Sequence, residues 1–370
     1  PRVVRAPHAA TPESAPPHLI LTSYQPGEAL CEGVVQAPVH RELPVPSGGI
    51  RFRPPNAPAQ DGGENRPITL RFRIDASGRP LGIAAAEGAP HQLQHPDVIP
   101  AFAAWGFAPG PERSGCEIRF QPRSAPVAEA EMADVYRYTA LIRPNRPGWN
   151  SAVNRAAFER AKPAGSTCFD RQPAVRLRAF PAYEEIEQRP GSVSYSFLYF
   201  DIDASGRPVN VRVVSSDGHE ELNRRSIDAV RQSRFAPGER KGCSYFYWKG
   251  QPEPMPAPPA PDSADYRTED SNCPVDDRSP WQTLPRLVFP EEFRRRGIEG
   301  WAIVRFDVAP WGEVGNVSAA AAEPAALFGE RAVGIVRAAK KPESPNGYRG
   351  CTTRVLFKLP RSGAEAASAE

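Results

Sequence analysis

One pattern occurs three times along this chain: an alternating apolar run that breaks at a glycine turn, resumes, and after an amphipathic stretch ends on Gly-Cys. The copies span Leu70–Cys116, Phe197–Cys243 and Trp301–Cys351. The interval from the turn glycine to the cysteine is 38, 37 and 39 residues, counted from Gly78, Gly206 and Gly312. A period this regular indicates one small fold present in three copies, so the chain is expected to form an array of small units.

The six cysteines follow the same period, because each copy owns two of them. The simplest pairing is one disulfide per unit, and the sequence alone leaves the other connectivities open. The three pairs of this simplest scheme are Cys31 with Cys116, Cys168 with Cys243, and Cys273 with Cys351. No Cys-x-x-Cys motif or Cys/His cluster has metal-ligand spacing, so no zinc site or other metal is predicted. Disulfides persist in an oxidising compartment, which favours a periplasmic or extracellular location.

Charge and hydropathy exclude two classes of function. The 370 residues include 46 basic and 43 acidic side chains and carry a net charge of +3, without a long Lys/Arg tract, so no nucleic-acid partner is expected. No apolar run approaches the ~18 residues that a membrane span requires. The chain begins with Pro1. We therefore expect that a targeting segment was removed, either a cleaved signal peptide or an anchor, and the sequence does not choose between them.

Proline-rich stretches and the repeat together divide the chain into six parts. The expected divisions are a disordered arm (1–17), unit 1 (18–124, the most divergent copy), unit 2 (125–251), a proline-rich linker (252–265), unit 3 (266–362) and a disordered tail (363–370). The 44 prolines concentrate in the arm, in the front half of unit 1 and in the linker, which excludes helices there.

Periodicity predicts the elements of each unit. The Asp-Ala-Ser-Gly turns of units 1 and 2 predict hairpins. Helices are expected at Asn150–Lys162, from a start near Asp217–Gly218, at Pro290–Gly297 and at Ala325–Ala339, with a short acidic helix at 182–188. In unit 3 the order helix, strand, strand, helix, strand predicts a three-stranded antiparallel sheet with helices on one face, an α+β fold.

Unit 3 contains the run LPRLVFPEEFRRRGIEGWAIVRFDVAPWGEVGNV (Leu284–Val317), a following helix and the closing strand RVLFKL. In these residues it resembles the C-terminal domain of TonB, the periplasmic end of the energy transducer for outer-membrane receptors. Unit 2 carries the later half of the same pattern in FDIDASGRPVNVRVVSSDGHEELNRRSIDAVRQSRFAPG, and unit 1 only the hairpin and FAPG. The implied fold is three tandem, divergent TonB C-terminal-like domains.

The chain departs from the family pattern in several ways. It has three units, a cysteine pair in each, and no transmembrane helix with a long spacer, and unit 3 replaces the family's aromatic-Pro ending with Ala338–Pro342. These departures put energy transduction in doubt more than peptide binding.

The resemblance implies a binding mode in which a receptor peptide pairs as an extra strand with the edge of the sheet. The open edge of a sheet offers unpaired N–H and C=O groups to such a peptide. The candidate peptide-binding residues are Thr353, Arg354, Val355, Leu356, Phe357, Lys358 and Leu359 on the last strand, with Arg286 and Phe289 before it. Lys358 could instead discourage pairing, and the units could also pair their edges with one another.

No catalytic arrangement is predicted, and no cofactor. His91 and His95 are interpreted as a surface pair, and Asp203 as a turn residue whose neighbour Asp201 points to the opposite face. The run Arg294–Arg296 is interpreted as a solvated helix end rather than a phosphate or lipid contact. The aromatic run Tyr245–Trp248 either exposes a sticky surface or seals a contact with a neighbouring unit.

These observations favour a non-enzymatic periplasmic protein that binds peptides of envelope proteins, such as segments of TonB-dependent receptors. The second hypothesis is an energy transducer whose inner-membrane anchor is missing from this chain. The third is a structural scaffold of the envelope without peptide affinity.

Overall fold

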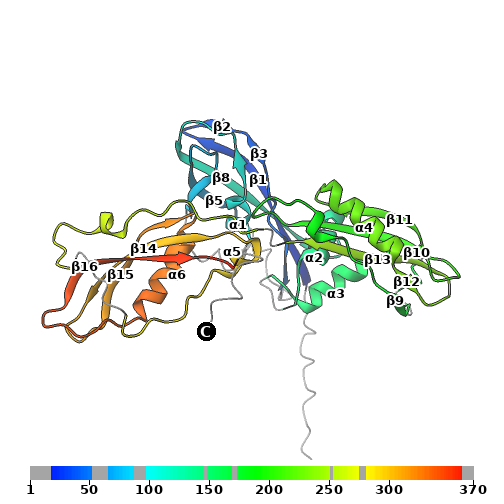
Figure 1. The fold of residues 1–370 in the computed structure, drawn as a ribbon. Coiled ribbons are helices and arrows are strands. Elements are labelled where there is room, and N and C mark those ends of the chain that lie inside the picture. Colours follow the sequence, from blue (N-terminus) through cyan, green and yellow to red (C-terminus); the bar gives the residue numbers. More distant parts are fainter. Residues whose placement is uncertain are drawn as a thin grey trace, which may run out of the picture.

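The three units predicted from the sequence lie side by side in a computed structural model, which describes residues 18–51, 66–86, 97–144, 148–168, 173–250, 253–274 and 281–360. Unit 1 (blue to cyan) lies between unit 2 (green) and unit 3 (yellow to red) in Figure 1. The predicted pair His91 and His95 lies outside these residues. So do the predicted arm (1–17) and the predicted tail (363–370).

Each unit contains the same three-stranded antiparallel ladder, in which a hairpin receives a third strand beside its first strand. In unit 1 the hairpin is β5 (Ile68–Ile74) and β6 (Pro80–Ala85), and the third strand is β8 (Arg113–Pro126). In unit 2 they are β10 (Ser194–Ile202), β11 (Pro208–Ser216) and β13 (Arg240–Lys249). In unit 3 they are β14 (Gly300–Val308), β15 (Val314–Glu323) and β16 (Tyr348–Phe357). The predicted hairpins are therefore confirmed, and the fold is α+β with several small antiparallel sheets.

The turn glycine of the sequence pattern has one structural role in all three units. Gly206 has φ of 86°, and a Cβ built on it would lie 2.2 Å from the carbonyl oxygen of Phe235. That same close approach brings a backbone hydrogen bond of 2.9 Å from Phe235 N–H to the Gly206 carbonyl. Gly78 and Gly312 make the equivalent bonds with Phe107 and Lys341. A side chain fits at none of these positions, because left-handed backbone and lack of space coincide.

A helix after each hairpin covers one face of the sheet. These helices are α1 (Val98–Ala103), α4 (Glu220–Gln232) and α6 (Ala326–Arg337). Helix α4 begins at Glu220, close to its predicted start, but Asp217 does not cap it. His219 is the N-cap and its Nδ1 accepts from the N–H of Leu222, whereas Asp217 accepts from Tyr195 N–H. The predicted helix at 182–188 is only a single 3₁₀ turn, Tyr183–Glu185. The helix α5 (Glu291–Arg296) ends at left-handed Gly297 as predicted.

The sheet of unit 2 is covered by helices on both faces, so the prediction of helices on one face is wrong here. The helices α2 (Met132–Leu141) and α3 (Ser151–Arg160, within the predicted Asn150–Lys162 and capped by Asn150) pack on the face opposite α4. Tyr195, Phe197 and Tyr199 alternate toward α2 and α3, and Leu198 and Phe200 toward α4. Both faces of strand β10 are therefore apolar. A strand buried on both faces lacks the alternation of apolar and polar residues, so the sequence pattern did not indicate the second covered face.

The sheet of unit 3 also has a covered second face, but the cover is irregular chain. The proline-rich segment, residues 253–268, crosses this face and includes the 3₁₀ turn Ser263–Tyr266. Trp301 on β14 donates its indole N–H to the carbonyl of Pro258 at 2.9 Å. Residues expected to separate two units therefore pack against one of them.

Units 1 and 3 share a continuous hydrophobic core, which includes Phe102 and Phe107 from unit 1 and Phe306 and Phe328 from unit 3. The outer hairpin strand of unit 1 meets the end of β15, where Ile83 N–H donates to the Pro324 carbonyl at 2.9 Å. A second core joins α2, α3 and the sheet of unit 2 to Leu21 of unit 1. The units thus form a joined body instead of independent beads.

Short strands complete the fold around unit 1. A long N-terminal strand, β1 (His18–Cys31), pairs with β8, β2 (Val34–Gln36) and β4 (Ser47–Arg51). Two further two-stranded pairs precede the closing strands: β3 (Pro38–His40) with β7 (Gly106–Phe107), and β9 (Val175–Leu177) with β12 (Arg234–Phe235). An isolated bridge between Thr283 and Lys340 holds the same place in unit 3.

Candidate functional site: the outer edges of the third strands

The closing strand of unit 3 has an open side. Strand β16 pairs with β14 from Cys351–Phe306 to Phe357–Gly300. Within the described part of the chain, residues 352–357 make no other backbone–backbone hydrogen bond. Six consecutive residues of a regular strand thus keep one side of their backbone available for a further strand.

The corresponding side of unit 1 is filled by the chain itself. Strand β1 runs antiparallel along β8, in register from Ile20–Pro126 to Cys31–Cys116, with a bulge after Pro26. Tyr24, Ala29 and Cys31 of β1 enter the core shared by units 1 and 3. In unit 1, a strand of the same chain is therefore added to the edge that is open in unit 3.

The geometry at the cysteine pair indicates which backbone groups face outward. The Cα atoms of Cys31 and Cys116 lie 3.9 Å apart, the short spacing of a pair without mutual hydrogen bonds. Cys116 thus directs its N–H and C=O toward β5, and its successor Glu117 directs them toward β1. Transferred along the uninterrupted register of β16, this alternation directs the backbone groups of Thr352, Arg354 and Leu356 outward.

All three cysteine pairs predicted from the repeat are disulfide-bonded, and no free cysteine is present among the six. In units 2 and 3 the first cysteine belongs to an irregular segment at the beginning of the third strand's outer edge. Thr167 N–H donates to the Lys241 carbonyl at 3.0 Å, and Arg349 N–H donates to the Asn272 side chain at 2.6 Å. The disulfide therefore attaches a neighbouring segment to the first residues of β13 and of β16. Within the described residues, the contact between that segment and the strand does not continue beyond these first residues.

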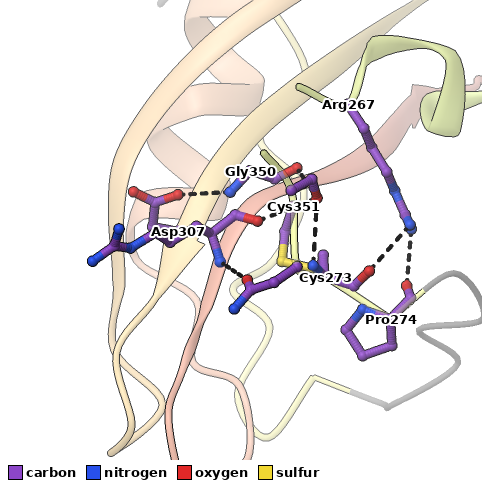
Figure 2. Close-up of a disulfide and its surroundings, with 9 residues drawn as sticks. Arg267, Cys273, Pro274, Asp307, Gly350 and Cys351 are labelled. Atoms are coloured by element: carbon purple, nitrogen blue, oxygen red, sulfur yellow. Dashed lines mark hydrogen bonds between the residues drawn. A yellow bond between two sulfur atoms is a disulfide. The ribbon is translucent and has the colours of Figure 1, made fainter. Parts of the chain in front are cut away.

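Figure 2 shows how this fastening is built in unit 3. Asp307 on β14 accepts a hydrogen bond of 2.8 Å from the N–H of Gly350, immediately before Cys351. Arg267 donates to the carbonyls of Cys273 and Pro274 at 3.3 and 2.9 Å and so holds the other half of the disulfide. Gly350 has φ of 63°, and this left-handed residue explains the Gly-Cys pair of the sequence pattern.

The far end of the β13 edge in unit 2 is flanked by the chain around the 3₁₀ turn Tyr183–Glu185. Lys249 donates to the carbonyls of Tyr183 and Ile186, and Tyr247 donates its hydroxyl to the Ala179 carbonyl at 3.1 Å. Burial raises the pKa of Tyr247 well above its ordinary value. The side chains of Tyr247 and Lys249 are thus fixed to this flanking chain, but residues 244–249 of β13, like residues 352–357 of β16, make no backbone–backbone hydrogen bond outside their ladder within the described residues.

The nine predicted binding residues of unit 3 differ in burial and in the contacts they make. Val355 packs against the core on the α6 side, and Arg354 and Leu356 are exposed, with Leu356 at 39%. Phe289 stacks edge-on with Phe357 at a centroid distance of 5.8 Å, so it supports the strand from inside. The others are half-buried Thr353 and Leu359, buried Phe357, and exposed Lys358 and Arg286. Their role in binding stays a prediction.

The interpretation of Arg294–Arg296 as a solvated helix end is wrong for its last residue. Arg296 is 1% exposed and donates to both carboxylate oxygens of Asp97 at 2.8 and 2.6 Å. It also donates to Glu42 at 3.3 Å and to the carbonyl of Gly191 at 3.1 Å. Burial alone would lower its pKa, but the attraction of the Asp97 and Glu42 carboxylates outweighs burial and raises the pKa. One side chain of unit 3 therefore binds groups of units 1 and 2.

The carboxylates and the aromatic run considered in the sequence have structural partners. Asp201 accepts from the Asn210 side chain and the Gly242 N–H at 2.9 and 2.8 Å, and Asp203 accepts from the turn residues 205 and 207. Phe246 packs toward α2 and α3, so this part of the aromatic run covers the core of unit 2 itself and not a contact with a neighbouring unit. Trp248 is 43% exposed with Arg143 over its ring.

Units 2 and 3 thus define a class of small α+β domain in which a hairpin, a helix and an edge strand follow one another. The family model of the Gram-negative bacterial TonB protein C-terminal matches residues 179–248 and 285–359, and these two segments belong to that family. The resemblance predicted for units 2 and 3 is confirmed, whereas membership of unit 1 stays a prediction. No curated protein matches the chain. Among the described residues, no helix is long and apolar enough to cross a membrane.

Proposed function

We propose that the protein is a non-enzymatic, TonB-like component of the periplasm whose unit 3 binds an extended segment of an envelope protein along β16. The observation that carries the proposal is the outward-facing backbone of residues 352–357, which pairs with no other strand of the described chain. Membership of residues 285–359 in the TonB C-terminal family supports an envelope partner, such as a segment of a TonB-dependent receptor. Three disulfides support an oxidising compartment.

Strand β1 supports the mode of binding, because it occupies the equivalent edge in unit 1. Its antiparallel register brings alternate apolar side chains, Ala29 and Cys31 among them, onto the covered face of the sheet. A segment on β16 would place alternate side chains beside Thr353, Val355 and Phe357, where α6 closes the core. The other alternate side chains would lie beside Arg354 and Leu356, which are exposed. Main-chain bonds supply affinity in such complexes, and these two rows of side chains supply selectivity.

The experiment compares Leu356→Pro with Leu356→Ala in the full chain. Proline removes an outward N–H and leaves the ladder to β14 in place, while alanine removes the same side chain and keeps the N–H. Binding of N-terminal peptides of TonB-dependent receptors is measured by calorimetry. We expect Leu356→Ala to retain binding and Leu356→Pro to weaken it at least about tenfold, about 1.4 kcal/mol.

Thermal unfolding of both variants shows whether unit 3 remains folded. Equal affinity of the two variants would overturn binding along β16. A receptor peptide that fails to bind the unsubstituted protein would remove the receptor as partner, and a chain that binds no envelope peptide would favour the scaffold hypothesis.

A further inference from the structure

The outer face of the unit 1 sheet corresponds to a face that is covered in unit 3, but no described segment of the chain covers it in unit 1. This is the face opposite α1 in unit 1 and opposite α6 in unit 3. In unit 2 the same face packs against α2 and α3, and in unit 3 it carries the proline-rich segment, residues 253–268. In unit 1, Arg71, Glu117 and Arg119 on this face are exposed.

Registers establish which residues correspond. Phe72 pairs with Cys116 in unit 1 as Phe306 pairs with Cys351 in unit 3. One residue earlier, Arg71 faces Glu117 as Arg305 faces Thr352. Two residues before that, Thr69 faces Arg119 as Ile303 faces Arg354. Arg71 and Arg119 of unit 1 therefore hold the positions of Arg305 and Arg354 of unit 3.

The two arginines of unit 3 both bind backbone carbonyls of the proline-rich segment. Arg305 donates to the Tyr266 carbonyl at 2.7 and 3.3 Å, and Arg354 donates to the Pro261 carbonyl at 3.5 Å. Proline fixes its own φ and drives the preceding residue to an extended conformation, so residues 254–261 are held extended, whereas Tyr266 ends the 3₁₀ turn that follows them. The carbonyls of the extended part, Pro261 among them, are consequently free to accept from arginine.

Arg71 and Arg119 make no hydrogen bond or ion pair with the described residues of the chain. Beside Arg71 lies a hollow of about 410 Å³, lined also by Arg73, Gly82, Gly115 and Glu117. Unit 3 has Asn316 at the position of Gly82, so the missing side chain of Gly82 leaves space here, whereas Gly115 and its counterpart Gly350 are both glycines. Arg71 and Arg119 thus occupy the positions of the two hydrogen-bond donors of unit 3. Among the described residues, no carbonyl accepts from them as the proline-rich segment does in unit 3.

We propose that the outer face of the unit 1 sheet binds a proline-rich extended segment of another protein, whose carbonyls accept hydrogen bonds from Arg71 and Arg119. The hollow beside Arg71 receives side chains of that segment. Arg73 contributes less, because it already pairs with Glu323 of unit 3 at 2.7 Å. This site is separate from the β16 edge and does not depend on the function proposed for that edge.

The probe is a fluorescein-labelled peptide with the sequence of residues 253–268, EPMPAPPAPDSADYRT, added to the full chain. The resident copy on unit 3 is tethered at an effective concentration in the ~mM range, so a micromolar probe does not displace it. Fluorescence anisotropy is measured for the unsubstituted chain, for Arg71→Gln/Arg119→Gln, and for Arg224→Gln/Arg231→Gln. The last variant removes the same charge from two exposed arginines of α4.

We expect Arg71→Gln/Arg119→Gln to weaken binding at least about tenfold, and the α4 variant to stay within about twofold. A peptide with every proline replaced by glycine should bind several-fold more weakly, because it loses the extended conformation. Equal losses in both arginine variants would mean attraction by net charge alone and would overturn the proposal. It would also be overturned by no binding at about 1 mM peptide, or by a change of self-association in sedimentation as the sole effect.

Discussion

Replacing Arg296 with methionine should destabilise the joined body far more than the same change two residues earlier. Arg296 is buried with Asp97 and Glu42, whose side chains are 10% and 12% exposed. Methionine fills a similar volume and removes the guanidinium from both carboxylates. Within the described residues, the Asp97 side chain then keeps the Val45 N–H at 2.7 Å, and Glu42 keeps His40 at 3.1 Å and the Val193 N–H at 3.4 Å. Removing one partner of a buried pair costs about 3–5 kcal/mol, because the other charge stays buried.

The matched control is Arg294→Met on the same helix. Arg294 is 46% exposed and pairs with Glu291 one turn away, an interaction that contributes about 0–1 kcal/mol at the surface. Both variants lose one arginine from α5 and gain the same side chain, so helix propensity and net charge change equally. The difference between them isolates the buried contact.

Guanidinium unfolding followed by tryptophan fluorescence measures the free energy of unfolding of each variant. We expect Arg296→Met to lose about 3–5 kcal/mol relative to the unsubstituted chain and Arg294→Met less than about 1. Asp97→Asn should lower the free energy of unfolding less in the Arg296→Met background than in the unsubstituted chain, because the two side chains interact directly. Equal stabilities of the two methionine variants would refute the claim that Arg296 joins the units.

Three further changes test the repeat, the carboxylates and the disulfides. Gly206→Ala should lower the free energy of unfolding by about 2 kcal/mol or more, because φ is 86° and the Phe235 carbonyl blocks a Cβ, while Gly334→Ala on the open side of α6 should raise it by about 0.5–1 kcal/mol in denaturant titrations. Burial would raise the pKa of Asp201, but the bonds from Asn210 and Gly242 lower it below its ordinary 3.8; its stabilisation is therefore complete above that pH and lost as the pH falls through the lower value of the folded state. The difference in melting temperature between the unsubstituted chain and Asp201→Asn should accordingly shrink below about pH 4, and a constant difference would contradict the assignment. Cys273→Ser/Cys351→Ser opens a loop with a separation of 78 residues and should lower the free energy of unfolding by about 4 kcal/mol, with non-reducing peptide mapping of the unsubstituted chain giving the three intra-unit pairs.

The features predicted correctly from the sequence depend on short-range chemistry. A glycine at a left-handed turn, a Gly-Cys pair at a bulge and a helix ending in Gly297 each report the conformation of one or two residues. The disulfides followed from the same period, because equal spacing in three copies left one simple pairing. Local signals of this kind survive whatever the neighbouring units do.

The features that were missed depend on contacts between distant parts of the chain. Arg294 and Arg296 have the same chemistry, yet one is exposed and the other meets Asp97, 199 residues earlier. A polar residue such as Ser23 is expected at the surface, yet Ser23 lies buried on β1 and its hydroxyl donates to Asp134 at 2.7 Å. The proline-rich segment reads as a spacer because its cover of β14 uses backbone carbonyls, which every residue has. Side-chain patterns carry no record of such partners.

The three units treat one hazard of an open sheet differently, and the difference singles out β16. Unpaired edges invite association with other chains, so most are blocked. The outer hairpin strands bend at left-handed residues, Gly82, Asn210 and Asn316, where their registers shift. Strand β8 is covered by β1, and at the end of β13 the side chains of Tyr247 and Lys249 bond the segment around Tyr183–Glu185. Within the described residues, the outer backbone of β16 beyond Cys351 bonds no other strand or segment, and the strand keeps a regular register with exposed Leu356. This open edge lies in a segment that matches the TonB C-terminal family, and the two observations together support the partner strand proposed above.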